Sequence, residues 1–171
     1  MHRFARKPLA LALSLLALAL LVAACAPAAG SSSGAAIRAG SEAIVVQRGQ
    51  TVYVRVDSSL TAFGITEQDL NVRTWVPTGV RSQVGDVTLQ FGLRDVEGAT
   101  GWQIDLSRMR IERSIDNNPV QGTTSSIVDL WAELKVEVPV DAIAGVYRVR
   151  AVLEMRGGGQ QSVTFRLDVR G

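Results

Sequence analysis

The stretch SIVDLWAELKVEVPV, residues 126–140, decides the fold class predicted for this chain. From Val128 to Val138 every second residue is apolar, and the residues between them are charged apart from Trp131. Alternation with a period of two places one face of a β-strand on a core and the other face in water. The stretch therefore predicts a half-buried strand with Trp131 on its polar face.

Segments with the same period lie on both sides of this stretch. Residues 146–155 and 162–169 alternate in the same way, and the glycine-rich RGGGQQ at residues 156–161 predicts a hairpin turn. Shorter apolar runs predict further strands at residues 42–47, 51–57, 71–76, 86–93 and 102–113. About seven or eight short strands with turn signals between most of them predict an all-β fold, a single antiparallel β-sandwich.

Two local features interrupt the alternation. Between Leu106 and Met109 the apolar residues change phase by one position, which predicts a β-bulge or bend inside that strand. Residues 66–70, TEQDL, predict a single helical turn with Thr66 as its N-cap.

The segment after the deciding stretch carries a family resemblance. Residues 138–155 are similar to the end of many bacterial immunoglobulin-like domains, in which a strand ends in a P-x-D-A-x-A-G-x-Y-x-V phrase before the last hairpin. The matching residues are Pro139, Asp141, Ala142, Ala144, Gly145, Tyr147 and Val149. The resemblance implies an immunoglobulin-like sandwich in which Tyr147 bonds its hydroxyl at a domain corner. It implies almost nothing about function, because such sandwiches have many roles.

The N-terminal residues predict export. A basic start, MHRFARK, precedes an apolar run at residues 9–22 and a series of small residues, which is the pattern of a secretory signal. The run is shorter than the roughly 20 apolar residues that a membrane span needs. An uncleaved N-terminal anchor remains the alternative.

Val22, Ala23, Ala24 and Cys25 resemble the bacterial lipobox, although leucine is commoner than valine at its first position. The resemblance implies lipid attachment at the Cys25 thiol and cleavage between Ala24 and Cys25. The chain would then bind membrane lipid through its N-terminal acyl groups, since stable anchoring needs more than one lipid chain. The alternative is an ordinary signal peptide that is cut elsewhere.

Three regions follow from these patterns: a signal peptide at residues 1–24, a lipidated flexible tether at 25–42 and a β-sandwich domain at 43–171. The predicted location is the exported side of the cell membrane or outer membrane. Within the lipoprotein resemblance, Ala26 in place of aspartate after the cysteine implies sorting to an outer membrane where the host has one.

Composition excludes several classes of function for the predicted mature chain. Residues 1–24 hold three of the 18 basic residues and none of the 16 acidic ones, so the remainder carries a net charge of −1. This balance gives no basis for nucleic-acid binding. His2 and Cys25 are the only histidine and cysteine. His2 would be removed with the signal peptide, and the Cys25 thiol would be lipidated. We therefore expect no histidine-based nucleophile, no metal site built on histidine or thiolate, no disulfide and no cofactor.

Oxygen ligands cluster at Asp116, Asn117, Asn118 and Pro119, with Asp129 and Asp141 further along the chain. A calcium site would use such groups, but their spacing matches no calcium loop, and Asn-Asn-Pro is typical of a turn. The sequence therefore favours a turn and no metal.

Trp75, Trp102 and Trp131 are the candidate ligand contacts. An exposed tryptophan on a sheet face or at a loop end stacks on sugars or anchors a protein partner. The alternative for Trp131 is cover by a second packed layer or by a loop, since large aromatic side chains are usually buried.

Enzymatic chemistry has little support in the sequence. No pattern places two carboxylates across a cleft, and Lys135 alternates onto a solvated face. Arg108, Arg110 and Arg113 would bind an anionic polymer, but their acidic neighbours favour a charge-laced strand. We therefore expect a non-enzymatic envelope lipoprotein that binds another envelope protein or has a structural role. The alternative is a carbohydrate or cell-wall binding module that uses its tryptophans.

Overall fold

The computed structural model describes residues 35–70, 72, 75–79, 82–118 and 123–171. Ten strands and three 3-10 helices of at most four residues make up the regular structure of these residues. The prediction of an all-β fold is therefore confirmed.

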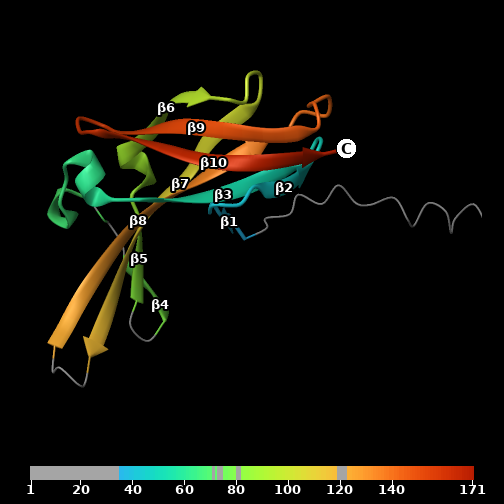
Figure 1. Cartoon of the computed structure of the whole chain (residues 1–171). Coiled ribbons are helices and arrows are strands. Elements are labelled where there is room, and N and C mark those ends of the chain that lie inside the picture. Colours follow the sequence, from blue (N-terminus) through green and yellow to red (C-terminus); the bar gives the residue numbers. More distant parts are fainter. Residues whose placement is uncertain (1–34, 71, 73–74, 80–81, 119–122) are drawn as a thin grey trace, which may run out of the picture. The chain divides into compact units, whose positions relative to one another are not determined.

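The first sheet has six strands in the order β1-β3-β8-β7-β5-β4. Their bounds are β1 Ile37–Arg38, β3 Thr51–Ser58, β4 Trp75–Gly79, β5 Ser82–Asp86, β7 Gln103–Asn118 and β8 Thr123–Glu137. The deciding stretch forms most of β8, which lies between β3 and β7. Figure 1 shows the β7–β8 hairpin running past the end of β3, with β5 beside it.

The second sheet has four strands in the order β2-β10-β9-β6. Their bounds are β2 Ile44–Gln47, β6 Phe91–Glu97, β9 Gly145–Met155 and β10 Gln160–Arg170. Strands β9 and β10 form an antiparallel hairpin whose turn falls at residues 156–159. The predicted glycine-rich turn is therefore confirmed.

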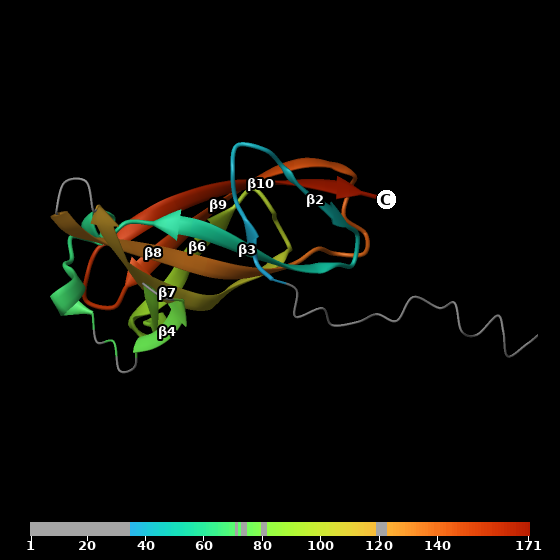
Figure 2. The same cartoon turned by 90° about the horizontal axis from the view of Figure 1, so that it is seen from below.

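The two sheets share one hydrophobic core, and Figure 2 shows them as two layers. Val54 of β3 and Leu134 of β8 meet Leu153 of β9 and Leu167 of β10, and all four side chains are fully buried. These residues are the inward positions of the alternating patterns, whose outward positions stay half-buried or exposed. Period-two alternation thus places each strand on the common core.

Three details of the prediction need correction. Ten strands are described instead of about seven or eight, and β7 and β8 are 16 and 15 residues long. The sheets are mixed, because β1 pairs with β3 and β2 with β10 in parallel. Strand β1 also falls within the predicted tether at residues 25–42. The cause is the same for β1 and β2: strands of two and four residues are too short to show their period or direction.

The predicted irregularity in residues 102–113 is confirmed. The register between β7 and β8 shifts between Leu106 and Arg108, so that Ser107 is the extra residue of a β-bulge. The bulge allows Ile104, before it, and Met109, after it, both to lie in the core. The change of phase in the sequence therefore reports a real bulge.

The helical turn predicted at residues 66–70 is a 3-10 helix, η3, at Glu67–Asp69 with Thr66 as N-cap. The Asp69 carboxylate accepts hydrogen bonds from the Thr66 backbone N–H at 2.7 Å and from its hydroxyl at 2.8 Å. These bonds hold the pKa of Asp69 below its ordinary value. Two further 3-10 helices are η2 at Leu60–Phe63, which follows β3, and η4 at Thr88–Gln90, which connects β5 of the six-stranded sheet to β6 of the four-stranded sheet.

Candidate functional site

The most distinctive surface of the described residues lies where the β6–β7 and β8–β9 connections meet. A hollow of about 450 Å³, open to solvent, lies between residues 98–102 and 139–147. Its lining consists of Gly98, Thr100, Gly101, Trp102, Pro139, Asp141, Ala142, Ile143 and Tyr147. The segment similar to immunoglobulin-like domains thus supplies one wall.

Two aromatic rings form the floor of this hollow. Trp102 and Tyr147 lie with their ring centroids 4.7 Å apart and their planes tilted by 44°. The Tyr147 hydroxyl donates a hydrogen bond of 2.8 Å to the Ile143 carbonyl oxygen, as expected for a tyrosine at a corner of the domain. This bond and the 3.2 Å bond from Ala142 N–H to the Pro139 carbonyl hold the β8–β9 connection in shape.

Three exposed aliphatic side chains lie on the segment that forms one wall of the hollow, and one of them, Ile143, lines it. Val140 is 79% exposed, Ile143 77% and Val146 64%, and all three lie within seven residues of one another. Single exposed apolar residues are common, but a group of them beside a hollow is typical of an interaction surface. We call Val140, Ile143, Val146 and the hollow the loop-end patch.

Trp131 lies elsewhere, on the outer face of the six-stranded sheet. The Arg55 guanidinium carbon lies 4.3 Å from the centre of its ring, and that of Arg110 lies 5.8 Å away. These side chains come from the strands on either side of β8 and leave Trp131 half-buried. The Trp131 ring, a candidate ligand contact on sequence grounds, is therefore already in cation–π contact with two arginines.

Trp102 and Trp131 do not form one site. Trp131 pairs with Arg110 of β7, and Arg110 lies eight residues beyond Trp102 along the chain. At about 3.3 Å per strand residue the two rings belong to positions roughly 25 Å apart. Trp75 begins β4 at the sheet edge, and its side chain lies outside the described residues.

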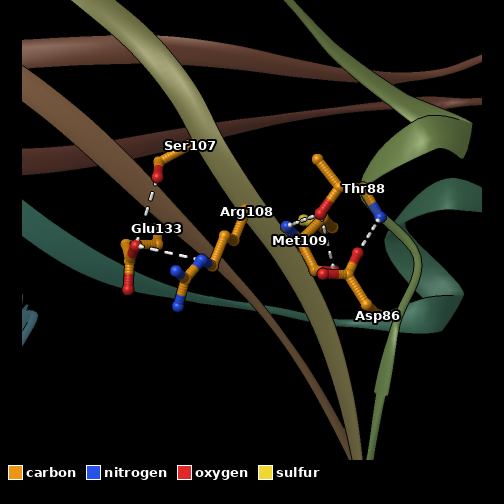
Figure 3. A network of polar contacts seen from close by, with 6 residues as sticks. All are labelled: Asp86, Thr88, Ser107, Arg108, Met109 and Glu133. Atoms are coloured by element: carbon orange, nitrogen blue, oxygen red, sulfur yellow. Dashed lines mark hydrogen bonds and ion pairs between the residues drawn. The ribbon is translucent and has the colours of Figure 1, made fainter.

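A polar network surrounds the bulge at Ser107 (Figure 3). Glu133 of β8 accepts a hydrogen bond of 3.2 Å from the Ser107 hydroxyl, and Arg108 Nε lies 3.9 Å from the same carboxylate oxygen. On the other side, Met109 N–H donates to the Thr88 hydroxyl at 2.8 Å. The network holds the extra residue in place, and sequence reasoning missed it because its partners come from three separate strands and a 3-10 helix.

Asp86 completes this network. Its carboxylate accepts a hydrogen bond of 2.9 Å from the Thr88 backbone N–H. Partial burial raises the pKa of Asp86, but the hydrogen bonds from Thr88 and the charges of Arg110 and Arg108 outweigh it, so that the pKa lies below its ordinary value. Asp86 is therefore held ionised at the start of η4.

The arginines and the lysine of the six-stranded sheet are engaged by neighbours. Arg108 forms an ion pair with Glu133, Arg110 lies over Trp131, and Arg113 forms an ion pair with Glu67. A hydrogen bond to Glu137 and the charge of that residue raise the pKa of Lys135. A catalytic lysine needs the opposite shift. These contacts support the interpretation of a charge-laced strand.

The remaining candidates are placed as follows. Asp116, Asn117 and Asn118 end strand β7 and do not form the predicted turn, and Pro119 lies outside the described residues. Among the described residues no three histidine, cysteine or acidic side chains converge as metal ligands. Ala24 and Cys25 also lie outside them.

No protein-family model, curated protein or solved structure matches the chain. Within the described residues no helix has the length and apolar character to cross a membrane.

Proposed function

We propose that this chain is an exported bacterial lipoprotein, anchored at Cys25, whose all-β domain binds another protein of the cell envelope. The domain acts as a non-enzymatic binding or structural module. It would lie on the exported side of the cell membrane or outer membrane, held by acyl chains on Cys25.

The loop-end patch carries the proposal for protein binding. Val140, Ile143 and Val146 expose aliphatic surface beside an open hollow, which is the arrangement of apolar centre and concave neighbour that partner proteins cover. The bond from Tyr147 to Ile143 fixes the backbone of this surface, which lowers the entropy lost on binding.

The domain is proposed to be immunoglobulin-like in the finer sense as well. Two sheets on a common core and the corner bond of Tyr147 support this assignment. The parallel pairing of β2 with β10 gives the smaller sheet an added edge strand.

A second candidate function is glycan binding in the same hollow. Trp102 and Tyr147 offer aromatic surface there, and Asp141 and Thr100 add oxygen atoms that would accept hydrogen bonds from sugar hydroxyls. Protein binding ranks first because the exposed side chains of the loop-end patch are aliphatic.

Site-specific photo-crosslinking in cells tests the proposal on the intact lipoprotein. A crosslinker at Ile143 should trap one dominant protein, whereas one at Leu89, which is equally exposed at 77% but lies in η4, should trap none. Trapped wall polymer at position 143 would favour the glycan alternative. The same adducts from both positions would contradict a specific loop-end site.

A further inference from the structure

Two arginines lie directly opposite each other on the outer face of the four-stranded sheet. Arg148 of β9 pairs in register with Arg166 of β10, and both side chains are exposed. Residues opposite in an antiparallel pair have Cβ atoms about 4.5–5.5 Å apart on the same face. The side chains of Arg148 and Arg166 therefore leave the sheet from neighbouring positions on the same face.

Neither arginine has a partner within the described part of the chain, whereas its neighbours do. Arg150, the next residue on the same face of β9, bonds to Ser162 at 2.7 Å and to Glu97 at 3.2 Å. Asp168, the next residue on the same face of β10, forms an ion pair with Arg170 at 2.9 Å. The side chains of Arg148 and Arg166 form no ion pair and no hydrogen bond with any described residue.

Small residues lie beside the pair on the neighbouring segments. Gly98 lies against the backbone of Arg148, so closely that a Cβ there would fall 1.9 Å from the Arg148 carbonyl oxygen. On the other side, Ile44 pairs with Leu167, which places Ala43 beside Arg166. Glycine and alanine flank the arginines and offer no charge.

The arrangement costs the fold free energy, because like charges directly opposite are destabilising. It also differs from the six-stranded sheet, where Arg38 and Arg55 share Asp57 and Arg108 faces Glu133. An unpaired cross-strand arginine pair is thus a local feature that packing does not require.

We propose that Arg148 and Arg166 bind two carboxylates of an acidic polypeptide. The proposal rests on the proposed function, since it names the chemistry of the envelope protein that docks. Carboxylates on one helix turn or on paired strands are spaced by about 5–6 Å, which matches the arginine spacing. Arg–carboxylate pairs are geometrically specific.

The apolar surroundings favour a polypeptide over a small anion. In the adjacent row, Val45 and Val146 lie on either side of Asp168 and are 49% and 64% exposed. Val146 also belongs to the loop-end patch, so the arginine pair lies beside one exposed aliphatic member of that patch. A protein partner covers both the aliphatic and the charged groups, which a free phosphate does not.

The test uses the mature chain with Cys25→Ser, so that no acyl group contributes to binding. Poly-L-glutamate is titrated at fixed ionic strength against this chain and against Arg148→Gln, Arg166→Gln and Arg150→Gln. All three variants lose one positive charge, but only the first two alter the unpaired arginines. We expect Arg148→Gln and Arg166→Gln to weaken binding at least tenfold, and Arg150→Gln to weaken it less than threefold.

Equal weakening in all three variants would show general electrostatic attraction and overturn the proposal. Binding to phosphatidylglycerol vesicles that depends on Arg148 and Arg166, without binding to poly-L-glutamate, would assign the pair to lipid headgroups and also overturn it.

Stability without ligand gives a second readout. Arg166→Gln should leave the urea midpoint unchanged or raise it, because it relieves repulsion, whereas Arg150→Gln should lower it by removing the contacts to Glu97 and Ser162. An equal fall in both would show a structural partner for Arg166 and contradict the proposal. Failed crosslinking at Ile143 with intact poly-L-glutamate selectivity would refute the loop-end function and leave the arginine site standing.

Discussion

At the scale of single residues, two glycines near the hollow share a backbone conformation but differ in their surroundings. Gly98 has φ of +86° and Gly101 has φ of +82°. A Cβ on Gly101 would meet no atom within 4 Å, whereas one on Gly98 would meet the Arg148 carbonyl. Alanine substitution at each glycine therefore separates two contributions to the loss of folding free energy. At Gly101 only the left-handed backbone conformation is strained, whereas at Gly98 the new Cβ also clashes with the β9 backbone.

We predict that Gly101→Ala destabilises the domain by about 1–2 kcal/mol, the cost of the backbone conformation alone. Gly98→Ala should cost about 3 kcal/mol or more, because the β9 backbone must also move. Urea unfolding followed by tryptophan fluorescence measures both. Equal losses would show that β6 and β9 are less closely packed at this point.

Asp86 gives a prediction about acid. Because the pKa of Asp86 is lowered in the folded state, its contribution to stability is complete above its unfolded value of about 3.9 and is lost as the pH falls through the folded value. Asp86→Asn should therefore be less stable than the wild type at pH 7, by less than about 1 kcal/mol, and the difference should shrink at pH 3.

Urea midpoints at the two pH values measure this difference. Asp141→Asn serves as the control, since Asp141 is exposed in the loop-end patch and makes no hydrogen bond or ion pair with a described residue. A difference for Asp86→Asn that is the same at both pH values would contradict the role of its charge.

What the sequence predicts at this scale depends on distance along the chain. The hydroxyl bond of Tyr147 was expected from the resemblance to immunoglobulin-like domains, and its acceptor, the Ile143 carbonyl, lies only four residues away. The sequence also placed Trp131 on the outer face of β8, but not the guanidinium groups over its ring. Arg55 and Arg110 reach Trp131 only through the registers of β3 and β7 with β8, which no local pattern encodes.

At the scale of elements, the bulge in β7 sets which face of that strand is buried. Deletion of Ser107 would remove the extra residue, so that Leu106 and Met109 alternate strictly and the apolar residues on both sides of it face the core without a bulge. We predict that the deletion variant keeps a cooperative unfolding transition. Ser107→Ala, which removes only the hydrogen bond to Glu133, should cost about 1 kcal/mol.

Circular dichroism and urea unfolding of both variants check this prediction. Loss of the cooperative transition in the deletion variant would show that the domain requires the bulge itself, and would contradict the interpretation of Ser107 as an extra residue in the register.

The strands differ in how well their own sequences predict them. The long alternating segments in β8, β9 and β10 were predicted, because each buries several inward residues on the core. The two-residue strand β1 was not predicted, nor was the parallel pairing of β1 with β3 and of β2 with β10, since parallel pairing at an edge depends on where the preceding chain crosses between the sheets.

At the scale of the whole molecule, the proposed anchor at Cys25 would decide where the domain works. Cys25→Ser should abolish incorporation of labelled fatty acid and release the chain from the membrane fraction. Metabolic labelling and fractionation measure both. The loop-end variant Ile143→Asp should keep full labelling, and labelling that persists in Cys25→Ser would place the lipid, or the anchor, elsewhere.

The position of β10 has a consequence for the order of synthesis. Ile44 of β2 pairs with Leu167 of β10. Strand β2 therefore cannot form this pairing until its partner, 123 residues further along the chain, has been synthesised. Pairings between such distant segments form slowly and only after much loop entropy is lost. During export as proposed, most of the chain would be translated before the smaller sheet had its central strand. The topology itself would then delay folding of the smaller sheet until most of the chain had been made.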